Sequence, residues 1–321
     1  MNCIHLINYF RQGGAENVAY NYIKVLKSLE VDSTIIGKPY SKTYESRFSK
    51  LATIEYSITP EALGDTNYIF IHSNQCLLRL LKYYRIIKKN NIRVIYIQHL
   101  NYNESKFWLL SKLINFLCTD FIQITPITST LIDRYIKIKK HFIVNFYIAK
   151  YEKTQWPLIR SEIRNKYNIP QDSIVVSFSG IFKPGKNIGK FIELAKSMQD
   201  DPKYKFLVIG DGPEADIIKA YTGNNIIWVG RVNDVEQYLI ASDIYAFMSL
   251  YEMMPMALIE AINTNKHIIA YNTDVNNFLL DNHVFHDINK HVIYDSIIPS
   301  GEDLKHYDEK YAYIELSKLV L

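Results

Sequence analysis

Short apolar runs alternate with longer amphipathic segments along this chain. In the first half, four runs rich in β-branched residues are typical of buried strands and cover 3–9, 33–37, 68–73 and 94–99. Apolar residues at helical spacing follow the first and third of these runs, at 16–29 and 76–89. Strands that alternate with helices predict a doubly wound α/β arrangement, a parallel sheet with helices on both faces.

The same alternation restarts after residue 150. Predicted strands cover 173–180, 204–210, 225–230, 243–249 and 266–272. Predicted helices cover 160–169, 187–198, 214–222 and 235–242, and a further helix starts near Met256. The periodicity is lost at 145–158, so the sequence predicts two α/β domains joined there. We expect residues 1–150 to form an N-terminal Rossmann-like domain, 151–300 a C-terminal one and 301–321 a final helix.

Charge is divided unevenly between the two halves. The chain has a formal net charge of +4, but residues 1–150 hold 20 Lys and Arg against 10 Asp and Glu, and residues 151–321 hold 17 against 23. Two segments, 77–93 and 131–142, mix basic residues with aromatic and aliphatic ones on predicted helices. That composition suits an anionic membrane surface, while a solvated basic face is the plainer alternative. Nucleic-acid binding competes, but the chain contains no recognised DNA- or RNA-binding module.

Three isolated cysteines, Cys3, Cys76 and Cys118, lack the spacing of a disulfide framework or a metal site. We therefore expect a reducing compartment and no structural metal. The N-terminus lacks the charged, apolar and small-residue regions of a signal peptide. The most apolar later stretch, 107–124, contains Lys and Asp and is too short and too charged to predict a membrane crossing. Together these features predict a cytoplasmic location.

Glycines and polar residues follow the predicted strands. Ligands bind beyond the carboxyl ends of the strands in open parallel sheets, so these positions are the candidate site. They are Gly13, Gly14, His72 and His99 in the first half, and 180–186, 210–214, Arg231, Val232 and Glu252 in the second. From position alone, a structural role explains His99 as well as a functional one does. His72 is interpreted as structural.

The stretch YEMMPMALIEAI combines a predicted helix start with two carboxylates. Proline is favoured at the first position of a helix, so Pro255 predicts a helix from about Met256. The free N–H groups there, those of Met256 and Ala257 included, favour an anion such as diphosphate. Glu252 precedes the helix and Glu260 lies one turn inside it, so a phosphate between two hydroxyl-bearing groups fits the spacing. Alternatively, both glutamates are ordinary surface residues and the methionines belong to the core.

Five segments in a fixed order carry more information than any single motif. They are GGAENVAYNYIKVL, VIYIQH, IRNKYNIPQDSIVVSFSG, FLVIGDGPEADI with NIIWVGRVNDVEQYLIASDIY, and SLYEMMPMALIEAI. They resemble the N-terminal glycine loop, the histidine-ending strand, the start of the second domain, the next two strands and the E-x7-E segment of retaining GT-B glycosyltransferases. The chain thus resembles glycosyltransferase family 4, the group 1 enzymes of bacterial polysaccharide biosynthesis. This resemblance implies two Rossmann-like domains that face an interdomain cleft.

The resemblance implies a nucleotide diphosphate sugar as donor and a role for each candidate residue. Glu252 would bind hydroxyls of the donor sugar, and Glu260 would bind the ribose. The amides of Met256 and Ala257 would bind the phosphates. Lys186 would neutralise the diphosphate leaving group, a role that suits its compact charge, with Lys183 as a second cation nearby.

Further residues would complete the donor site. Arg231 and Val232 would contact the nucleobase, largely through backbone groups. Gly14 would bring a backbone N–H close to the donor phosphate, which a side chain would obstruct. His99 would lie near the reacting sugar. The implied catalytic residues are His99, Glu252 and Lys186.

The implied activity is transfer of a hexose or N-acetylhexosamine, from a UDP-sugar rather than a GDP-sugar, to a surface-glycan acceptor. Capsule, O-antigen, lipopolysaccharide and exopolysaccharide are such glycans. The family retains anomeric configuration and needs neither metal nor cofactor; here positive charge would come from Lys186 and a helix start. Its acceptors are lipid-linked sugars or oligosaccharides, so the expected location is peripheral, on the inner face of a bacterial cytoplasmic membrane.

Three departures from the family pattern bear on activity. Ile181 stands where an arginine is expected, and Lys183 two positions on does not reproduce an arginine's planar fork. Met253 stands where a glycine is usual, and 144–148 replaces a common turn. These departures leave open a catalytically silent GT-B partner subunit. A nucleotide-sugar epimerase or hydrolase on the same scaffold is a further alternative.

The last stretch of the chain has Tyr307, Tyr311 and Ile314 at helical spacing, and Lys318 interrupts this stripe one turn later. The resemblance implies a helix that crosses back to the first domain. A helix packed on the second domain explains the pattern equally well.

Overall fold

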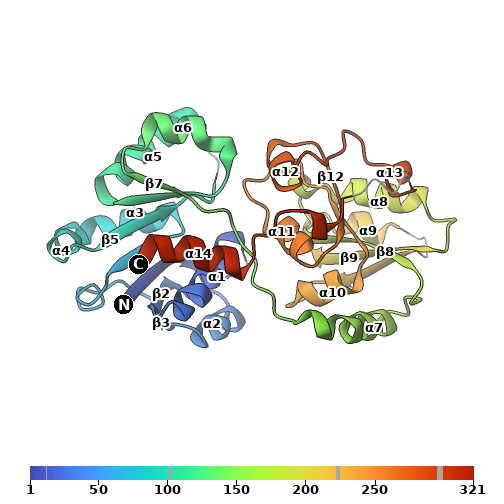
Figure 1. Cartoon of the computed structure of the whole chain (residues 1–321), viewed down its shortest axis with the longest axis horizontal. Coiled ribbons are helices and arrows are strands. Elements are labelled where there is room, and N and C mark those ends of the chain that lie inside the picture. Colours follow the sequence, from blue (N-terminus) through green and yellow to red (C-terminus); the bar gives the residue numbers. More distant parts are fainter. Residues whose placement is uncertain (12, 101–102, 222–224, 295–298) are drawn as a thin grey trace. The chain divides into compact units, whose positions relative to one another are not determined.

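The computed structural model describes residues 1–11, 13–100, 103–221, 225–294 and 299–321. The chain divides into two compact units, shown in Figure 1. Unit 1 comprises Met1–Phe146 and Glu309–Leu321, and unit 2 comprises Tyr147–Asp308. The division falls within the predicted join at 145–158, slightly before the predicted limit at residue 150. Residues 301–308 belong to unit 2 and precede the final helix.

Unit 1 is built on a seven-stranded parallel sheet with strand order β3-β2-β1-β4-β5-β6-β7. Its strands are β1 Asn2–Tyr9, β2 Asp32–Lys38, β3 Thr53–Glu55, β4 Tyr68–Ile71, β5 Arg93–Ile97, β6 Asp120–Gln123 and β7 Lys139–Phe142. The order reverses between β1 and β4, so the carboxyl ends of these strands are the expected ligand edge. The sequence predicted four of these strands and missed β3, β6 and β7, which are short and carry little periodic signal.

The helices of unit 1 are α1 Gly14–Ser28, α2 Lys42–Ser49, α3 Asn74–Leu80, α4 Tyr84–Lys89, α5 Glu104–Leu117, α6 Ser129–Tyr135 and α14 Glu309–Val320, with 3-10 turns η1 Leu81–Tyr83 and η2 Pro126–Thr128. The predicted helix at 76–89 therefore consists of three short consecutive pieces. The helical interpretation of 131–142 is wrong in its second half, because Lys139–Phe142 pairs with β6 as an edge strand. Pairing with a neighbour decides the conformation of such a polar stretch, and its own side chains do not.

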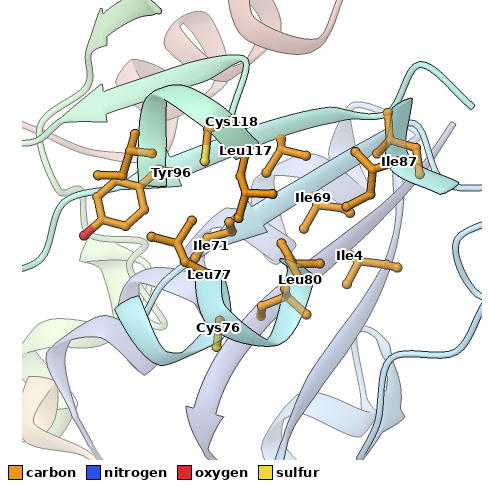
Figure 2. Packing of buried hydrophobic residues seen from close by; sticks show 14 of the residues in the cluster. Ile4, Ile69, Ile71, Cys76, Leu77, Leu80, Ile87, Tyr96, Leu117 and Cys118 are labelled. Atoms are coloured by element: carbon orange, nitrogen blue, oxygen red, sulfur yellow. The ribbon is translucent and has the colours of Figure 1, made fainter. Parts of the chain in front are cut away.

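The core of unit 1 forms where helices cover the sheet. Figure 2 shows one part of it, in which Ile69 and Ile71 of β4 lie next to Leu77 and Leu80 of α3. All four side chains are fully buried. Burial of each such side chain contributes about 1.5–3 kcal/mol. The apolar runs that predict the strands are therefore also the residues that stabilise the sheet.

The final helix, α14, packs against α1 within unit 1 (Figure 1). Its buried residues are Ala312, Leu316, Leu319 and Val320. The apolar stripe predicted from the sequence is wrong at both ends, because Ile314 is exposed and Tyr307 precedes the helix in unit 2. Of the two alternatives for this helix, the structure shows the one in which α14 packs on the first domain.

Side chains from the sheet fix the C-terminal end of α14. Arg93 Nη1 donates a hydrogen bond to the carbonyl of Leu319 at 2.7 Å, and the Tyr68 hydroxyl donates to the carbonyl of Val320 at 2.7 Å. The guanidinium of Arg93 is held in turn by the buried carboxylate of Asp120 at 2.8 Å. The last carbonyls of a helix have no partners within it, so these donors fix where α14 ends.

Unit 2 is built on a five-stranded parallel sheet with strand order β10-β9-β8-β11-β12. Its strands are β8 Ile174–Ile181, β9 Tyr204–Asp211, β10 Ile226–Gly230, β11 Ile244–Phe247 and β12 His267–Ala270. All five coincide with predicted runs, and the order reverses between β8 and β11.

The helices of unit 2 are α7 Trp156–Lys166, α8 Ile188–Ser197, α9 Asp216–Lys219, α10 Val235–Ala241, α11 Met256–Asn263, α12 Asp274–Leu279 and α13 Lys290–Tyr294, with 3-10 turns η3 Lys153–Gln155, η4 Pro184–Lys186 and η5 Gly301–Asp303. The helix predicted at 214–222 is shorter in the structure, and its last residue lies outside the described residues. Helices α12 and α13 were not predicted.

The ends of β8 and β9 approach each other so closely that only glycine fits. A Cβ on Gly210 would lie 2.0 Å from the carbonyl oxygen of Gly180, and one on Gly212 would lie 2.6 Å from the backbone nitrogen of Phe182. Gly210 also has a φ of +131°, which side chains rarely tolerate. The Gly-Asp-Gly sequence is therefore required by the backbone of the two strand ends.

Two further expectations concerned the cysteines and membrane-spanning segments. Cys3, Cys76 and Cys118 are buried thiols without disulfide bonds. Burial raises the pKa of the Cys3 thiol to about 12 and that of Cys76 to about 11, so both stay protonated at neutral pH. None of the helices in the described part of the chain has the length and apolar character needed to span a membrane.

Candidate functional site

Two loops of unit 2 leave its sheet where the strand order reverses. β8 and β11 are hydrogen-bonded neighbours, so the loops that follow them begin at the same edge. Lys186 follows β8, Glu252 follows β11, and Lys186 Nζ lies 2.5 Å from Glu252 Oε1 in an ion pair. The ring of Phe247, at the end of β11, lies 6.0 Å from the same ammonium group. The edge at which parallel sheets bind ligands thus presents a cation and a carboxylate in contact.

Both members of this ion pair are accessible to a ligand. The side chain of Lys186 is 19% exposed and that of Glu252 is 24% exposed. Lysine is a donor suited to anionic groups, and a carboxylate accepts hydrogen bonds from hydroxyl groups.

Helix α11 begins at Met256, and Pro255 is its N-cap. The predicted helix start near Met256 is confirmed. Pro255 stands one position before the first helical residue, because its ψ of 114° lies outside the helical range. The first intrahelical bond runs from Ile259 N–H to the carbonyl of Pro255 at 3.2 Å. The N–H groups of Met256 and Ala257 therefore have no acceptor within the helix, and the helix dipole favours an anion there.

Tyr245 of β11 lies within electrostatic reach of both glutamates of the E-x7-E segment. Burial raises the pKa of its hydroxyl, and the charges of Glu260 and Glu252 raise it further. The same hydroxyl lies 3.0 Å from Ser179 Oγ at the end of β8. The charges of Glu252 and Glu260 thus both act on the pKa of one buried hydroxyl. Tyr245 is not apparent from the sequence, because an aromatic residue inside an apolar strand carries no sign of polar contacts.

The departures from the family pattern have defined positions. Ile181 is 52% exposed at the end of β8, where the expected arginine would stand. Lys183 is exposed and precedes the 3-10 turn that carries Lys186. Met253 is half-buried, and its φ is not positive, so its backbone does not require glycine. The segment at 144–148 is buried in the structure.

The predicted base-binding residues follow β10. Gly230 ends this strand with a φ of +72°, which turns the chain away from it. Arg231 is exposed, and Val232 is partly buried against the cluster that contains Ile209 and Tyr238. β10 is the edge strand, separated from β11 by β9 and β8. The structure places these two residues at the same end of the sheet as the ion pair but several strands away.

The glycine loop of unit 1 lies at the start of α1. Gly13 is the N-cap, and a Cβ there would lie 2.2 Å from Oε2 of Glu16, whose buried side chain folds back over the helix start. Burial raises the pKa of Glu16, and Arg11 pairs with it at 3.4 Å. A Cβ on Gly14 would meet no protein atom within 4 Å. A side chain at position 13 would therefore displace the carboxylate of Glu16, whereas the space beside Gly14 is open.

His99 follows β5 and ends a row of three histidines in unit 1. Its Nε2 lies 3.3 Å from His72 Nδ1, and His72 Nε2 lies 3.1 Å from His5 Nδ1. His5 and His72 are buried, and His99 is partly exposed. The interpretation of His72 as merely structural is thus incomplete, because it contacts the predicted site histidine directly. His5 lies inside the apolar run of β1, where the strand pattern conceals it.

The candidate residues form no metal-ligand cluster, and they do not line either of the two cavities named below. Within the described ranges, no group of three or more His, Cys, Asp or Glu side chains is arranged to hold a metal ion. Two cavities, of about 450 and 470 Å³, are lined by other residues, around Phe278 in unit 2 and Arg79 in unit 1.

Known proteins resemble this chain in both sequence and fold. Residues 159–293 match the family model described as "Glycosyl transferases group 1". The matched residues make up most of unit 2. The match lies within that unit and includes the Lys186–Glu252 pair and Glu260.

Two curated relatives match part of the chain. One is the Escherichia coli UDP-Gal:alpha-D-GlcNAc-diphosphoundecaprenol alpha-1,3-galactosyltransferase, 30% identical over 41% of this chain and 36% of its own length. The other is the putative teichuronic acid biosynthesis glycosyltransferase TuaC of Bacillus subtilis, 33% identical over 36% of this chain and 28% of its own. The matched stretch thus spans about a third of the length of these relatives.

Solved structures match the whole fold. The Anabaena protein HepE, crystallised with UDP-glucose, has a TM-score of 0.77 at 13% identity and covers 100% of this chain and 99% of its own. The chain therefore has the GT-B fold, and both of its units take part in the likeness.

Proposed function

We propose that this protein is a retaining, metal-independent glycosyltransferase that moves a hexose or N-acetylhexosamine from a nucleotide diphosphate sugar to a surface-glycan acceptor. The observation that carries the proposal is the Lys186–Glu252 pair at the sheet reversal of the unit that matches the group 1 glycosyltransferases. Retention of anomeric configuration rests on the likeness of the E-x7-E segment to that of retaining enzymes.

The residues of unit 2 divide the donor between them. Negative charge develops on the diphosphate as its bond to the sugar breaks, and Lys186 together with the start of α11 stabilises that charge. These two sources of positive charge take the role that a divalent cation has in metal-dependent enzymes. Glu252, released from the lysine, accepts hydrogen bonds from the sugar. Glu260, one turn into α11, accepts them from the ribose.

A UDP-sugar is the proposed donor and a lipid-linked diphosphate sugar the proposed acceptor. The E. coli relative is named for UDP-galactose and a diphosphoundecaprenol acceptor, and the Anabaena neighbour was crystallised with UDP-glucose. Both names support a UDP-sugar as the donor, and the E. coli name supports a lipid-linked diphosphate sugar as the acceptor. The product of such a transfer is a lengthened lipid-linked glycan, as surface polysaccharide assembly requires.

Thermal stabilisation by nucleotide sugars tests the donor. A ligand at 100 times its Kd stabilises a protein by about 2.7 kcal/mol. We expect UDP-sugars to raise the Tm of this protein more than GDP-sugars do, and Glu260→Gln to reduce that gain and lower turnover with a lipid-linked acceptor. Glu162→Gln, which changes an exposed helix glutamate of the same unit, is the matched control. Unchanged binding and turnover in Glu260→Gln would overturn the assignment.

A catalytically silent GT-B subunit is the second candidate, and Ile181 favours it. An exposed isoleucine there leaves the donor site with one cation fewer than the family pattern. This candidate expects UDP binding without transfer by the purified chain. Transfer by the purified chain alone rejects it.

We further propose that unit 1 binds the anionic face of a membrane through α3, α4 and α5. Trp108, Leu109 and Phe116 of α5 are exposed, and Lys112 Nζ lies 3.6 Å from the centre of the Trp108 ring. The ring of Phe116 stacks on Tyr84 of α4 at 4.6 Å, which joins the two helices into one surface. The exposed basic residues of η1 and α4 are Lys82, Arg85, Lys88 and Lys89. Apolar rings beside cations are typical of interfacial membrane binding.

Vesicle sedimentation tests this surface. We expect the protein to sediment with phosphatidylcholine vesicles that contain phosphatidylglycerol and not with phosphatidylcholine alone. Binding should fall when salt is raised, because salt screens the cations. The double variant Trp108→Ser with Phe116→Ser should abolish sedimentation, whereas Tyr313→Ser, an exposed aromatic residue of α14, should not. Equal sedimentation of the two variants would contradict the proposal.

A further inference from the structure

A continuous row of side chains runs through unit 1 from β2 to the end of β5. Ser33 Oγ lies 3.2 Å from Cys3 Sγ, which lies 3.5 Å from His5 Nε2. The row continues from His5 to His72 and from His72 to His99 at 3.1 and 3.3 Å. Ser33, Cys3 and His5 lie within strands of the sheet, His72 directly follows β4, and His99 lies two residues after β5. The polar row is therefore built into the core, where unpaired groups are costly.

The rings are also held by packing. His5 stacks on Phe70 with ring centres 4.8 Å apart, and the three imidazoles stack on one another at 5.4 and 5.5 Å. Tyr22 of α1 contacts His72 edge-on. Burial lowers the pKa of His5 to about 3 and that of His99 to about 4, and it lowers the pKa of His72 as well. All three rings are neutral at pH 7, so each carries one N–H.

One N–H per ring permits only two complete arrangements of this row. In the first, every hydrogen bond is donated in the direction from Cys3 toward His99. The Cys3 thiol donates to His5 Nε2, and His5 Nδ1–H donates to His72 Nε2. His72 Nδ1–H then donates to His99 Nε2. His99 then carries its proton on Nδ1. In the second, every donation is reversed, and His5 Nε2–H donates to sulfur. Imidazole nitrogen is a strong acceptor and thiol sulfur a weak one, so the first arrangement is favoured.

We propose that His72 is a positioning residue that fixes the proton of His99 on Nδ1, so that His99 presents a hydrogen-bond donor to the sugar during transfer. His99 Nε2 is occupied by His72, and among the described residues no hydrogen bond to its Nδ1 is found, so Nδ1 is the atom that would meet a ligand. The inference rests on the proposed function for its substrate, a sugar with hydroxyl acceptors. The proton order itself is a property of the protein.

The proposed arrangement has a chemical consequence at the reacting sugar. Transfer builds positive charge on the sugar ring. A neutral donor holds a hydroxyl in place without opposing that charge, whereas an imidazolium would oppose it. An imidazole whose proton is fixed on Nδ1 also cannot accept a proton there. The row therefore assigns His99 to holding the sugar and excludes it as a general base.

Long-range ¹H–¹⁵N NMR of the imidazole rings tests the proton order without any substrate. We expect the Nδ1–H form for His5, His72 and His99 in the full chain. His72→Phe keeps a ring for stacking but removes both hydrogen bonds, and should give His99 a mixture of the two forms. An Nε2–H signal for His99 in the wild type, or an unchanged Nδ1–H signal in His72→Phe, would overturn the proposal.

Two further variants separate positioning from packing. The amide of Asn reaches the place of Nδ1, so His72→Asn keeps a donor to His99; the amide of Gln reaches the place of Nε2, so His72→Gln does not. We expect kcat to fall about tenfold in His72→Phe and His72→Gln, with a smaller change in the KM for the donor, and to recover in His72→Asn. If His72→Phe does not fold, the comparison of His72→Asn with His72→Gln still tests the proposal. Equal kcat values in Asn and Gln would count against positioning.

Tyr96→Phe is the control for loss of a buried hydrogen bond in the same sheet, because the Tyr96 hydroxyl donates to Asn74. It should leave both the NMR signals and kcat unchanged, and a matching loss in it would refute a specific role for His72. If the wild type transfers no sugar from any nucleotide donor, the proposed function fails, whereas the NMR result still decides the proton order.

Discussion

At the residue scale, the contact between Lys186 and Glu252 is the feature with most chemical content. The two side chains come from loops that are distant in sequence, and their charges cancel in the pair. In the proposed function, a diphosphate would compete with Glu252 for Lys186, whereas a sugar would compete with Lys186 for Glu252. The diphosphate would therefore bind the lysine of the pair, and the sugar would bind the glutamate.

This competition predicts opposite effects of two substitutions on UDP binding. Glu252→Gln removes the competitor for Lys186, so we expect UDP to bind as tightly or a few times more tightly. Lys186→Gln removes the cation, and a charge-assisted hydrogen bond of about 1.5–3 kcal/mol is lost, which weakens UDP binding at least tenfold. Isothermal titration calorimetry with UDP measures both. Weaker UDP binding in Glu252→Gln would show that the carboxylate assists the nucleotide instead.

Glycines show how far residue-level prediction reaches. Gly14, at the start of α1, was predicted to make room for a ligand, and Gly13 was named only for its place after the first strand. In the structure the carboxylate of Glu16 fills the space beside Gly13, whereas the space beside Gly14 is open. A sequence reveals that a side chain is absent. It does not reveal whether the space is taken by another residue or by a ligand, because that depends on the rotamer of a neighbour.

At the element scale, α14 is the clearest case of an element stabilised by distant residues. It belongs to unit 1, although the residues just before it belong to unit 2. Its buried side chains pack on α1, and its last carbonyls are held by Arg93 and Tyr68. A 12-residue helix is marginal in isolation, so tertiary contacts must supply most of its stability.

Removal of residues 309–321 should therefore destabilise unit 1 selectively. The truncation exposes the face of α1 that α14 covers and leaves Arg93 with one partner fewer. We expect faster amide hydrogen exchange in β1, β4 and β5, measured by mass spectrometry, while β8, β9 and β11 exchange as before. Deletion of the exposed Leu321 alone is the control. Unchanged exchange in the truncated chain would mean that α14 contributes little.

Edge strands mark the limit of prediction for elements. β7 has the polar sequence KKHF, and β3 has only three residues. Buried strands carry continuous apolar runs, whereas an edge strand is defined by hydrogen bonds to its one neighbour. Those bonds form only after the neighbouring strand is in place.

At the scale of the whole molecule, the buried histidines make the two units respond differently to acid. A buried imidazole whose folded pKa lies below its unfolded value of about 6.5 favours folding only while it is neutral. Its stabilising effect is complete above pH 6.5 and is lost as the pH falls toward the folded pKa, about 3 for His5 and about 4 for His99. Asp120 adds to the loss at lower pH, because hydrogen bonds from His141 and Arg93 hold its pKa below the usual range.

We expect unit 1 to lose stability between pH 7 and pH 5 and unit 2 to change little. The loss is about 2 kcal/mol for His5 alone, since its buried ring resists protonation over this whole interval. Hydrogen exchange at both pH values, corrected for intrinsic rates, reports on each sheet separately. His283→Gln in unit 2 should leave the pH response of unit 1 unaltered. Equal responses of the two sheets would contradict this assignment.

The sequence by itself determined the alternation of strands and helices, the place of the join and the E-x7-E segment. These depend on local periodicity and on residue types at fixed spacing, which survive in a linear chain. Most of the candidate site residues named from the sequence lie at the carboxyl ends of their sheets, as the topology of parallel sheets requires.

Only the tertiary structure decided which of those residues meet. It paired Lys186 with Glu252, joined His99 to His72 and His5, and returned the last helix to unit 1. Each of these contacts links residues on different elements. Strand order and the close approach of loops depend on the packing of the whole core, so no local pattern in the sequence specifies them.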